Sequence, residues 1–204
     1  MSRSEVMNDQ HVGACRYESF QTVADDAITA YCAVMLDALA PIAARAAATL
    51  IERCETIAVA DGATGGLMSA GLLSVPGATQ FCLGGGVIYS FKGRDVLLGL
   101  SREELAGMEA VTESYALLQA RAIRDRFGAD WGIAESGSAG PGKHPRGAPT
   151  GRSCVGLVGP GIAVATTFES GSDNRLHNMG AFALTALQFL NSVLEVPPIN
   201  KVAG

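Results

Sequence analysis

The chain has 204 residues, of which 48% are hydrophobic and 17% charged, and its formal net charge is −5. This composition is typical of one globular domain with a hydrophobic core, and it argues against intrinsic disorder. The acidic balance and the small aromatic share of 6% argue against nucleic acid as a partner, because nucleic-acid-binding surfaces are basic and often carry stacking rings.

The first half of the chain is predicted to begin with helices after a polar segment of about twenty residues. Apolar residues at helical spacing predict a helix over residues 23–40, and Pro41 ends it, because the residue before a proline disfavours helical backbone. Pro41 then opens a second helix that ends near Arg53. A short apolar strand follows over residues 56–60, and a helix over residues 64–73.

Glycine and capping residues divide the middle of the chain into short elements. Strand-like residues flank the glycine triplet 84–86 on both sides, and a short helix is predicted over residues 95–100. Ser101 and Glu104 form a capping-box pattern that predicts another helix. Thr112 begins a strong helical pattern that ends near Phe127, with Gly128 as the stop signal.

The last third of the chain combines strands, a long loop and one helix. Strands are predicted over residues 131–134, 154–158 and 162–168, the last two joined by a hairpin, and a helix over residues 173–194. Residues 136–152 form a loop with five glycines and three prolines, long enough to suggest a functional role. Crossovers followed by a late hairpin predict an α/β domain with a mixed β-sheet. We expect an extension with one extra helix at residues 1–42, the α/β domain at 43–196 and a tail at 197–204.

Other sequence features bear on the location and the chemistry of the protein. The five cysteines are dispersed without a Cys-x-x-Cys pair, which is typical of reduced thiols in a cytoplasmic protein, and the three histidines lack metal-ligand spacing. No basic start followed by an apolar run marks a signal peptide. The most apolar region, residues 30–51, is interrupted by Asp37, Pro41 and Arg45, so we expect no membrane span.

Two glycine-containing segments carry the clearest functional signal. Residues 60–66 read Ala-Asp-Gly-Ala-Thr-Gly-Gly, and residues 87–94 read Val-Ile-Tyr-Ser-Phe-Lys-Gly-Arg. The two segments resemble A-E-S-C-T-G-G and V-T-Y-S-N-E-A-K, the signature of the CinA C-terminal domain family, the nicotinamide-nucleotide amidohydrolases. Weaker matches in the same order, at residues 74–79, 98–100, 110–113, 136–141 and 149–151, extend the resemblance over about residues 43–194.

The resemblance implies a three-layer α/β/α fold with a mixed β-sheet, a homodimer, and amide hydrolysis without a metal or a cofactor. In the family, the Ser of the first segment is the nucleophile, and the Tyr and Lys of the second activate it. The Ser position corresponds here to Gly62 and the Lys position to Arg94, and Tyr89 alone remains. Gly62 has no side chain that could attack, and arginine stays protonated and cannot act as a general base.

Two routes to hydrolysis remain open. In one, Asp61 or Tyr89 orients a water molecule in space left beside Gly62, while Arg94 holds a carboxylate or phosphate. In the other, a relocated hydroxyl attacks, and the candidates are Thr64, Ser136 and Ser138. Asp61 and Thr64 also have a purely structural interpretation: Asp61 can be a turn residue that bonds its own backbone, and Thr64 can cap the following helix.

The glycines of the first segment are candidate binding residues. A glycine turn that opens a helix presents backbone N–H groups to an oxyanion or a phosphate, so Gly65 and Gly66 join Gly62 in the predicted site.

The sequence therefore predicts a diverged hydrolase of a small amide, cyclic amide or lactone, with an anionic small-molecule ligand. One alternative is a catalytically inactive relative that binds a small anion or a protein partner. A second is a nicotinamide-nucleotide amidohydrolase. The apolar stripe of the predicted helix 23–40 fits either a dimer interface or the core.

Overall fold

The computed structural model describes residues 27–101, 103–145 and 147–196. The chain divides into two units, residues 1–33 and 34–204, and the described part of the first is the beginning of one helix. The sheet, its covering helices and the pocket discussed below belong to the second unit. Most of the predicted extension and the predicted tail lie outside the described residues.

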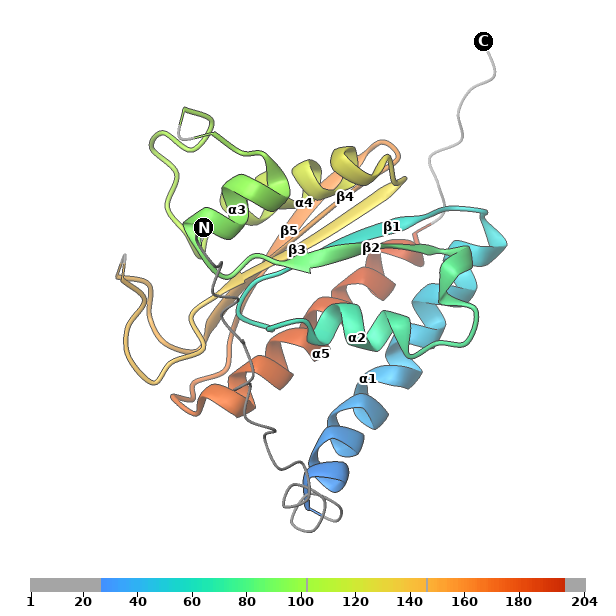
Figure 1. Cartoon of the computed structure of the whole chain (residues 1–204), viewed down its shortest axis with the longest axis horizontal. Coiled ribbons are helices and arrows are strands. Elements are labelled where there is room, and N and C mark those ends of the chain that lie inside the picture. Colours follow the sequence, from blue (N-terminus) through green and yellow to red (C-terminus); the bar gives the residue numbers. More distant parts are fainter. Residues whose placement is uncertain (1–26, 102, 146, 197–204) are drawn as a thin grey trace, which may run out of the picture. The chain divides into compact units, whose positions relative to one another are not determined.

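The described residues form an α/β fold (Figure 1). In chain order the elements are α1 (Ala27–Glu52), β1 (Ile57–Asp61), α2 (Leu67–Leu73), a 3₁₀ helix (Ala78–Gln80), β2 (Cys82–Val87), α3 (Phe91–Leu98), α4 (Glu113–Phe127), β3 (Trp131–Gly137), β4 (Arg152–Gly159), β5 (Ile162–Glu169) and α5 (Arg175–Leu194).

Within the described residues, the strands form one mixed sheet in the order β2-β1-β3-β4-β5. β1 is parallel to β2 and β3, whereas β4 is antiparallel to both β3 and β5. The predicted α/β class, with early crossovers and a late hairpin, is confirmed. β2 runs through the glycine triplet instead of being interrupted by it, and the three glycines pair with β1. This close pairing requires glycine, because a Cβ at Gly85 would lie 2.0 Å from the carbonyl oxygen of Val59 in β1.

Alternate residues of β1, an interior strand of the sheet, contact two different apolar layers. Ile57 and Val59 of β1 pack with α1, α2 and α5, whereas Ala58 and Ala60 pack with α3 and α4. Figure 1 shows α2 and α5 on one side of the sheet and α3 and α4 on the other. The predicted three-layer α/β/α arrangement is therefore confirmed.

One helix, α1, stands where the sequence predicted two helices separated at Pro41, so that prediction is wrong. Pro41 removes the backbone N–H that would bond to the carbonyl of Asp37. Both residues are exposed, so solvent can satisfy this carbonyl and the helix continues. The rule that a proline ends the preceding helix takes no account of whether the proline is exposed, and the prediction therefore failed here.

By length and apolar composition, the Val34–Glu52 part of α1 is the segment of the described residues that could cross a membrane. In this structure the apolar side of the segment lies in the core cluster of one sheet face, through Leu39, Ala43, Ala46, Ala47 and Leu50. The buried share of this segment is 28%.

Capping signals give mixed results. Thr112 accepts a hydrogen bond from the Tyr115 backbone N–H at 3.3 Å, and Gly128 ends α4 with a positive φ, as predicted. Ser101 and Glu104 make the two reciprocal hydrogen bonds of a capping box, at 2.8 and 3.2 Å. Residues 103–107 nevertheless form only turns, and Gly107, at φ 77°, turns the chain away from helical geometry. The helix predicted after Ser101 is wrong.

Glycines let α4 approach the sheet closely enough to place its first turns near the ends of the strands. A Cβ at Gly132 would lie 2.1 Å from the carbonyl oxygen of Ala120, and one at Gly156 would lie 2.5 Å from backbone atoms of Ala116. No side chain fits at these two positions of β3 and β4 unless the helix moves.

We therefore predict that Gly156→Ala lowers the free energy of unfolding by about 1–3 kcal/mol, the usual cost of overpacking. Gly93→Ala is the matched control in helix α3, since a Cβ there meets the Ser90 hydroxyl at 3.4 Å and the Val87 carbonyl oxygen at 4.0 Å, both ordinary contact distances. Urea unfolding measures both variants. Equal stabilities of the two variants would contradict the close approach of α4.

Candidate functional site

A pocket of about 420 Å³ lies at the carboxyl ends of β1, β2 and β3. The chain leaves β1 toward α2 on one face of the sheet and leaves the adjacent β2 toward α3 and α4 on the other. Such a divergence at the carboxyl ends of neighbouring strands is where open α/β sheets bind ligands. The volume falls in the range of small-molecule sites.

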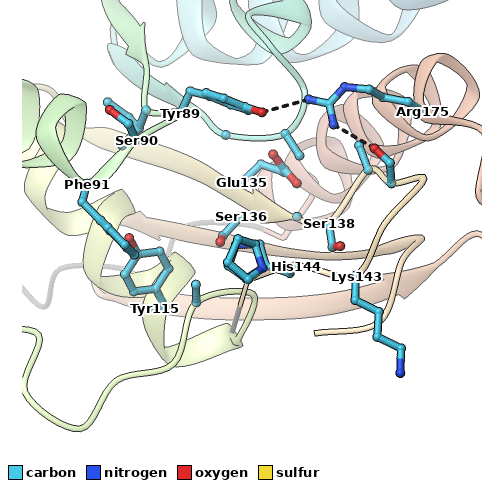
Figure 2. Close-up of a pocket in the computed structure, with 18 of the residues that line it drawn as sticks. Tyr89, Ser90, Phe91, Tyr115, Glu135, Ser136, Ser138, Lys143, His144 and Arg175 are labelled. Atoms are coloured by element: carbon cyan, nitrogen blue, oxygen red, sulfur yellow. Dashed lines mark hydrogen bonds between the residues drawn. The ribbon is translucent and has the colours of Figure 1, made fainter. Parts of the chain in front are cut away.

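Loops after each of these strands line the pocket. Its wall consists of residues 62–63, 88–91, 135–140 and 142–145, together with Ala110, Tyr115, Gln119 and Arg175. Figure 2 shows the labelled side chains around this space. Of the residues predicted from sequence, the structure brings together Gly62, Tyr89, Ser136 and Ser138 here.

Arg175 and Tyr89 form the cationic part of the pocket. Arg175, the first residue of α5, donates from Nη1 to the carbonyl oxygen of Gly140 at 2.9 Å and from Nη2 to the Tyr89 hydroxyl at 3.3 Å (Figure 2). Its guanidinium carbon lies 5.9 Å from the centre of the Tyr89 ring. Tyr89 is 71% exposed, so it is a pocket residue and does not belong to the core.

Two serine hydroxyls differ in their bonding. Ser136 Oγ accepts a hydrogen bond from the Val111 backbone N–H at 3.1 Å, which fixes its orientation. The Ser138 hydroxyl has no hydrogen-bond partner within the part of the chain that the structure describes. Ser138 therefore presents the less constrained hydroxyl of the two.

Asp61 and Thr64 do not line this pocket. Asp61 is fully buried, and its carboxylate accepts hydrogen bonds from the Thr64 hydroxyl at 2.8 Å, the Met68 N–H at 3.0 Å, and the N–H and hydroxyl of Ser69 at 3.2 and 2.6 Å. Asp61 thereby binds N–H groups in the first turn of α2, which have no hydrogen-bond partner within the helix. Both oxygens of its carboxylate are bonded to protein donors, so the carboxylate is not available to a ligand in the pocket.

Glu135 is a site residue that the sequence interpretation missed. It is 0% exposed, and its carboxylate accepts hydrogen bonds from the Thr64 N–H at 3.1 Å, the Ser153 hydroxyl at 2.7 Å and the Ala63 backbone. Burial raises the pKa of Glu135 to about 7, and these hydrogen bonds only partly oppose that shift. The signal that could have found it is an acidic residue inside the otherwise apolar strand Trp-Gly-Ile-Ala-Glu.

The space expected beside Gly62 is filled, which corrects the sequence interpretation. A Cβ at Gly62 would lie 2.3 Å from the carbonyl oxygen of Glu135 and 3.0 Å from its Oε2 atom. Gly65 and Gly66 have φ values of 65° and 99° and form the turn before α2, but they do not line the pocket. Glycine is thus a steric requirement at residue 62.

Arg94 lies outside this pocket and lines a neighbouring cavity of about 410 Å³. Its guanidinium bonds the Asp95 carboxylate through Nη2 at 2.8 Å and Nε at 3.2 Å, and it lies 5.1 Å from the centre of the Phe91 ring. This ion pair neutralises its charge. Within the described ranges, no cluster of three or more His, Cys, Asp or Glu residues is arranged to hold a metal ion.

The structure is that of an α/β protein with a pocket at the strand ends, and comparisons with known proteins assign its family. The sequence model of the CinA C-terminal domain matches residues 39–194. The chain belongs to the CinA C-terminal domain family.

Curated relatives and solved structures agree with this assignment. A CinA-like protein of Desulforapulum autotrophicum is 36% identical over 68% of this chain and 33% of its own length, and one of Desulfosudis oleivorans is 34% identical over 79% and 39%. The chain thus spans about a third of the length of such relatives. The competence damage-inducible protein A (ComA) of Klebsiella pneumoniae superposes with a TM-score of 0.72 at 26% identity, covering 78% of this chain and 98% of that one.

We predict that the buried carboxyl of Glu135 makes stability depend on pH. The pKa of Glu135 is raised in the fold from 4.5 to about 7, so its neutral carboxyl contributes to the stability of the folded protein. This contribution is fully present below pH 4.5 and is lost as pH rises through 7. Relative to wild type, Glu135→Gln should therefore gain up to about 3 kcal/mol of unfolding free energy between pH 5 and pH 8. Urea unfolding at both pH values measures this gain, and a gain near zero would show that Glu135 has an ordinary pKa.

We also predict that Gly62→Ser destabilises the fold, because the new Cβ would overlap the backbone of β3. The melting temperature should fall by several degrees, about the effect of 1–2 kcal/mol in a domain of this size. Gly142→Ser serves as control, since no atom lies within 4 Å of a Cβ built there. If Gly62→Ser matches this control, position 62 has room for a side chain after all.

Proposed function

We propose that this chain hydrolyses a small anionic carbonyl compound, such as an amide, cyclic amide or lactone, in the strand-end pocket. The observation that carries the proposal is the combination, in one pocket, of a cation without a carboxylate partner and a hydroxyl without a hydrogen-bond partner. Family membership supports the site, while the substrate and the reaction are inferred from the residues present.

Arg175 would hold the anionic end of the ligand. A guanidinium carries five N–H donors, and two atoms of this one are used, toward Gly140 and Tyr89. The side chain is exposed, and within the described residues its charge is not neutralised by a salt bridge. Its remaining donors suit the planar oxygens of a carboxylate or a phosphate.

Tyr89 and Ser138 would act on the carbonyl group. Since the Tyr89 oxygen accepts a hydrogen bond from Arg175, its own proton is available to the carbonyl oxygen of the substrate. Ser138 would attack the carbonyl carbon and pass its proton to His144, which lines the same pocket. The C–N or C–O bond of the substrate would then break, the leaving group would take up the proton, and water would release the acid from Ser138. Asp61 plays no part in this scheme, because its carboxylate is bonded to α2 and its neighbours.

A second candidate function is binding of a small anion without turnover. It is favoured by the complete shielding of both acidic groups near the pocket, since Asp61 and Glu135 are each 0% exposed. Neither carboxylate can then activate a water molecule in the pocket, which leaves hydrolysis dependent on the hydroxyl groups.

The test measures ammonia or acid release from a panel of small amides and lactones, with nicotinamide mononucleotide included as the substrate that the sequence resemblance suggests. We predict turnover that Ser138→Ala reduces by about 100-fold or more, in keeping with loss of a nucleophile. Arg175→Gln should raise KM more than it lowers kcat. The matched controls are Ser192→Ala and Arg121→Gln, at exposed positions outside the pocket.

The outcomes separate the two candidate functions. No turnover of any compound, with saturable binding of an anion that Arg175→Gln weakens, would establish the binding function instead. Turnover that survives Ser138→Ala would overturn the assigned nucleophile and point to attack by water.

A further inference from the structure

We infer that the neighbouring cavity is a second subsite, which takes an apolar and uncharged part of the same ligand. The inference rests on the proposed function for the anionic end of that ligand. It adds the substrate class: a small amphipathic compound with an anionic group at Arg175 and an aryl or branched alkyl group beyond Phe91.

The two cavities are continuous in their walls. Phe91, Ala110 and Tyr115 line both of them, so a ligand in one cavity contacts residues of the other. The second cavity has a volume of about 410 Å³, similar to that of the first. Each is large enough for one part of a small ligand.

The residues of the second cavity favour an apolar group over an anion. Leu105, Met108 and Ala110 contribute apolar surface beside the rings of Phe91 and Tyr115. Among the described residues that line it, the one arginine is Arg94, which already holds Asp95 at 2.8 Å. An anion entering this cavity would meet Asp95 as well as Arg94, and it would lose hydration without gaining a free cation.

Phe91 is the residue expected to contact the ligand between the two subsites. Its side chain is 53% exposed, although it is a large apolar ring at the start of α3. The guanidinium of Arg94 lies 5.1 Å from the centre of the Phe91 ring. An apolar group bound here would bury exposed ring surface, which is favourable at about 25 cal/mol per Å² of apolar area.

The experiment compares the affinities of acetate and phenylacetate, measured by isothermal titration calorimetry on the full chain. Phenylacetate should bind at least about tenfold more tightly than acetate, from burial of its ring. Phe91→Ala should remove most of this advantage. Val96→Ala is the matched control, because Val96 is exposed on the same helix and lines neither cavity.

The results distinguish this inference from the proposed function. Equal affinities for the two acids, or equal effects of Phe91→Ala and Val96→Ala, would overturn the subsite even if short amides are hydrolysed. Phe91-dependent binding of phenylacetate without turnover of any amide or lactone would support the subsite and refute hydrolysis. Absence of phenylacetate binding at millimolar concentration would also overturn it.

Discussion

Two buried carboxylates hold the turn that follows β1, and the geometry of the pocket depends on them. Asp61 binds the first N–H groups of α2, and Glu135 reaches across from β3 to the N–H groups of the same turn. Thr64 connects the two, since its hydroxyl donates to Asp61 and its N–H donates to Glu135. Each buried charge would be costly alone, and shared donors reduce that cost. The two acids also repel each other, which contributes to the raised pKa of Glu135.

This arrangement explains why glycines border the carboxyl of Glu135 on both sides. A Cβ at Gly62 would lie 3.0 Å from Oε2 and one at Gly137 would lie 2.3 Å from Oε1, so side chains at these positions and the buried acid exclude each other. If a serine stands at the position of Gly62 in relatives, as the sequence resemblance implies, its hydroxyl has no equivalent here. The proposed hydrolysis therefore relies on groups on the open side of the turn, where Tyr89, Ser138 and Arg175 lie.

Local signals such as periodicity and the hairpin glycines were sufficient for the α/β class with a mixed sheet, whereas the three layers were predicted from the family resemblance. The sequence wrongly predicted a helix break at Pro41, where solvent exposure lets the helix continue. It also wrongly predicted a helix after Ser101, where Gly107 turns the chain away from helical geometry. It placed Tyr89 in a strand-like segment and Ser136 and Ser138 in the long loop, whereas Tyr89 follows β2 and Ser136 belongs to β3. It did not predict Glu135 or Arg175 as site residues, because they reach the site only through pairing of β3 with β1 and the position of α5. Assembly into a homodimer and a cytoplasmic location stay predictions.

The difference between Arg175 and Arg94 shows why a motif position is a weak guide to a binding role. Both guanidinium groups lie over an aromatic ring, Tyr89 for the first and Phe91 for the second. Arg94 is buried and lies next to Asp95 in the chain, so its charge is neutralised by an ion pair with that more exposed carboxylate. Arg175 begins a helix and bonds only a carbonyl oxygen and a hydroxyl, both neutral, so its charge remains available to a ligand. A cation with neutral partners at the rim and a neutralised cation in the neighbouring cavity are therefore different environments, although both guanidinium groups lie over aromatic rings.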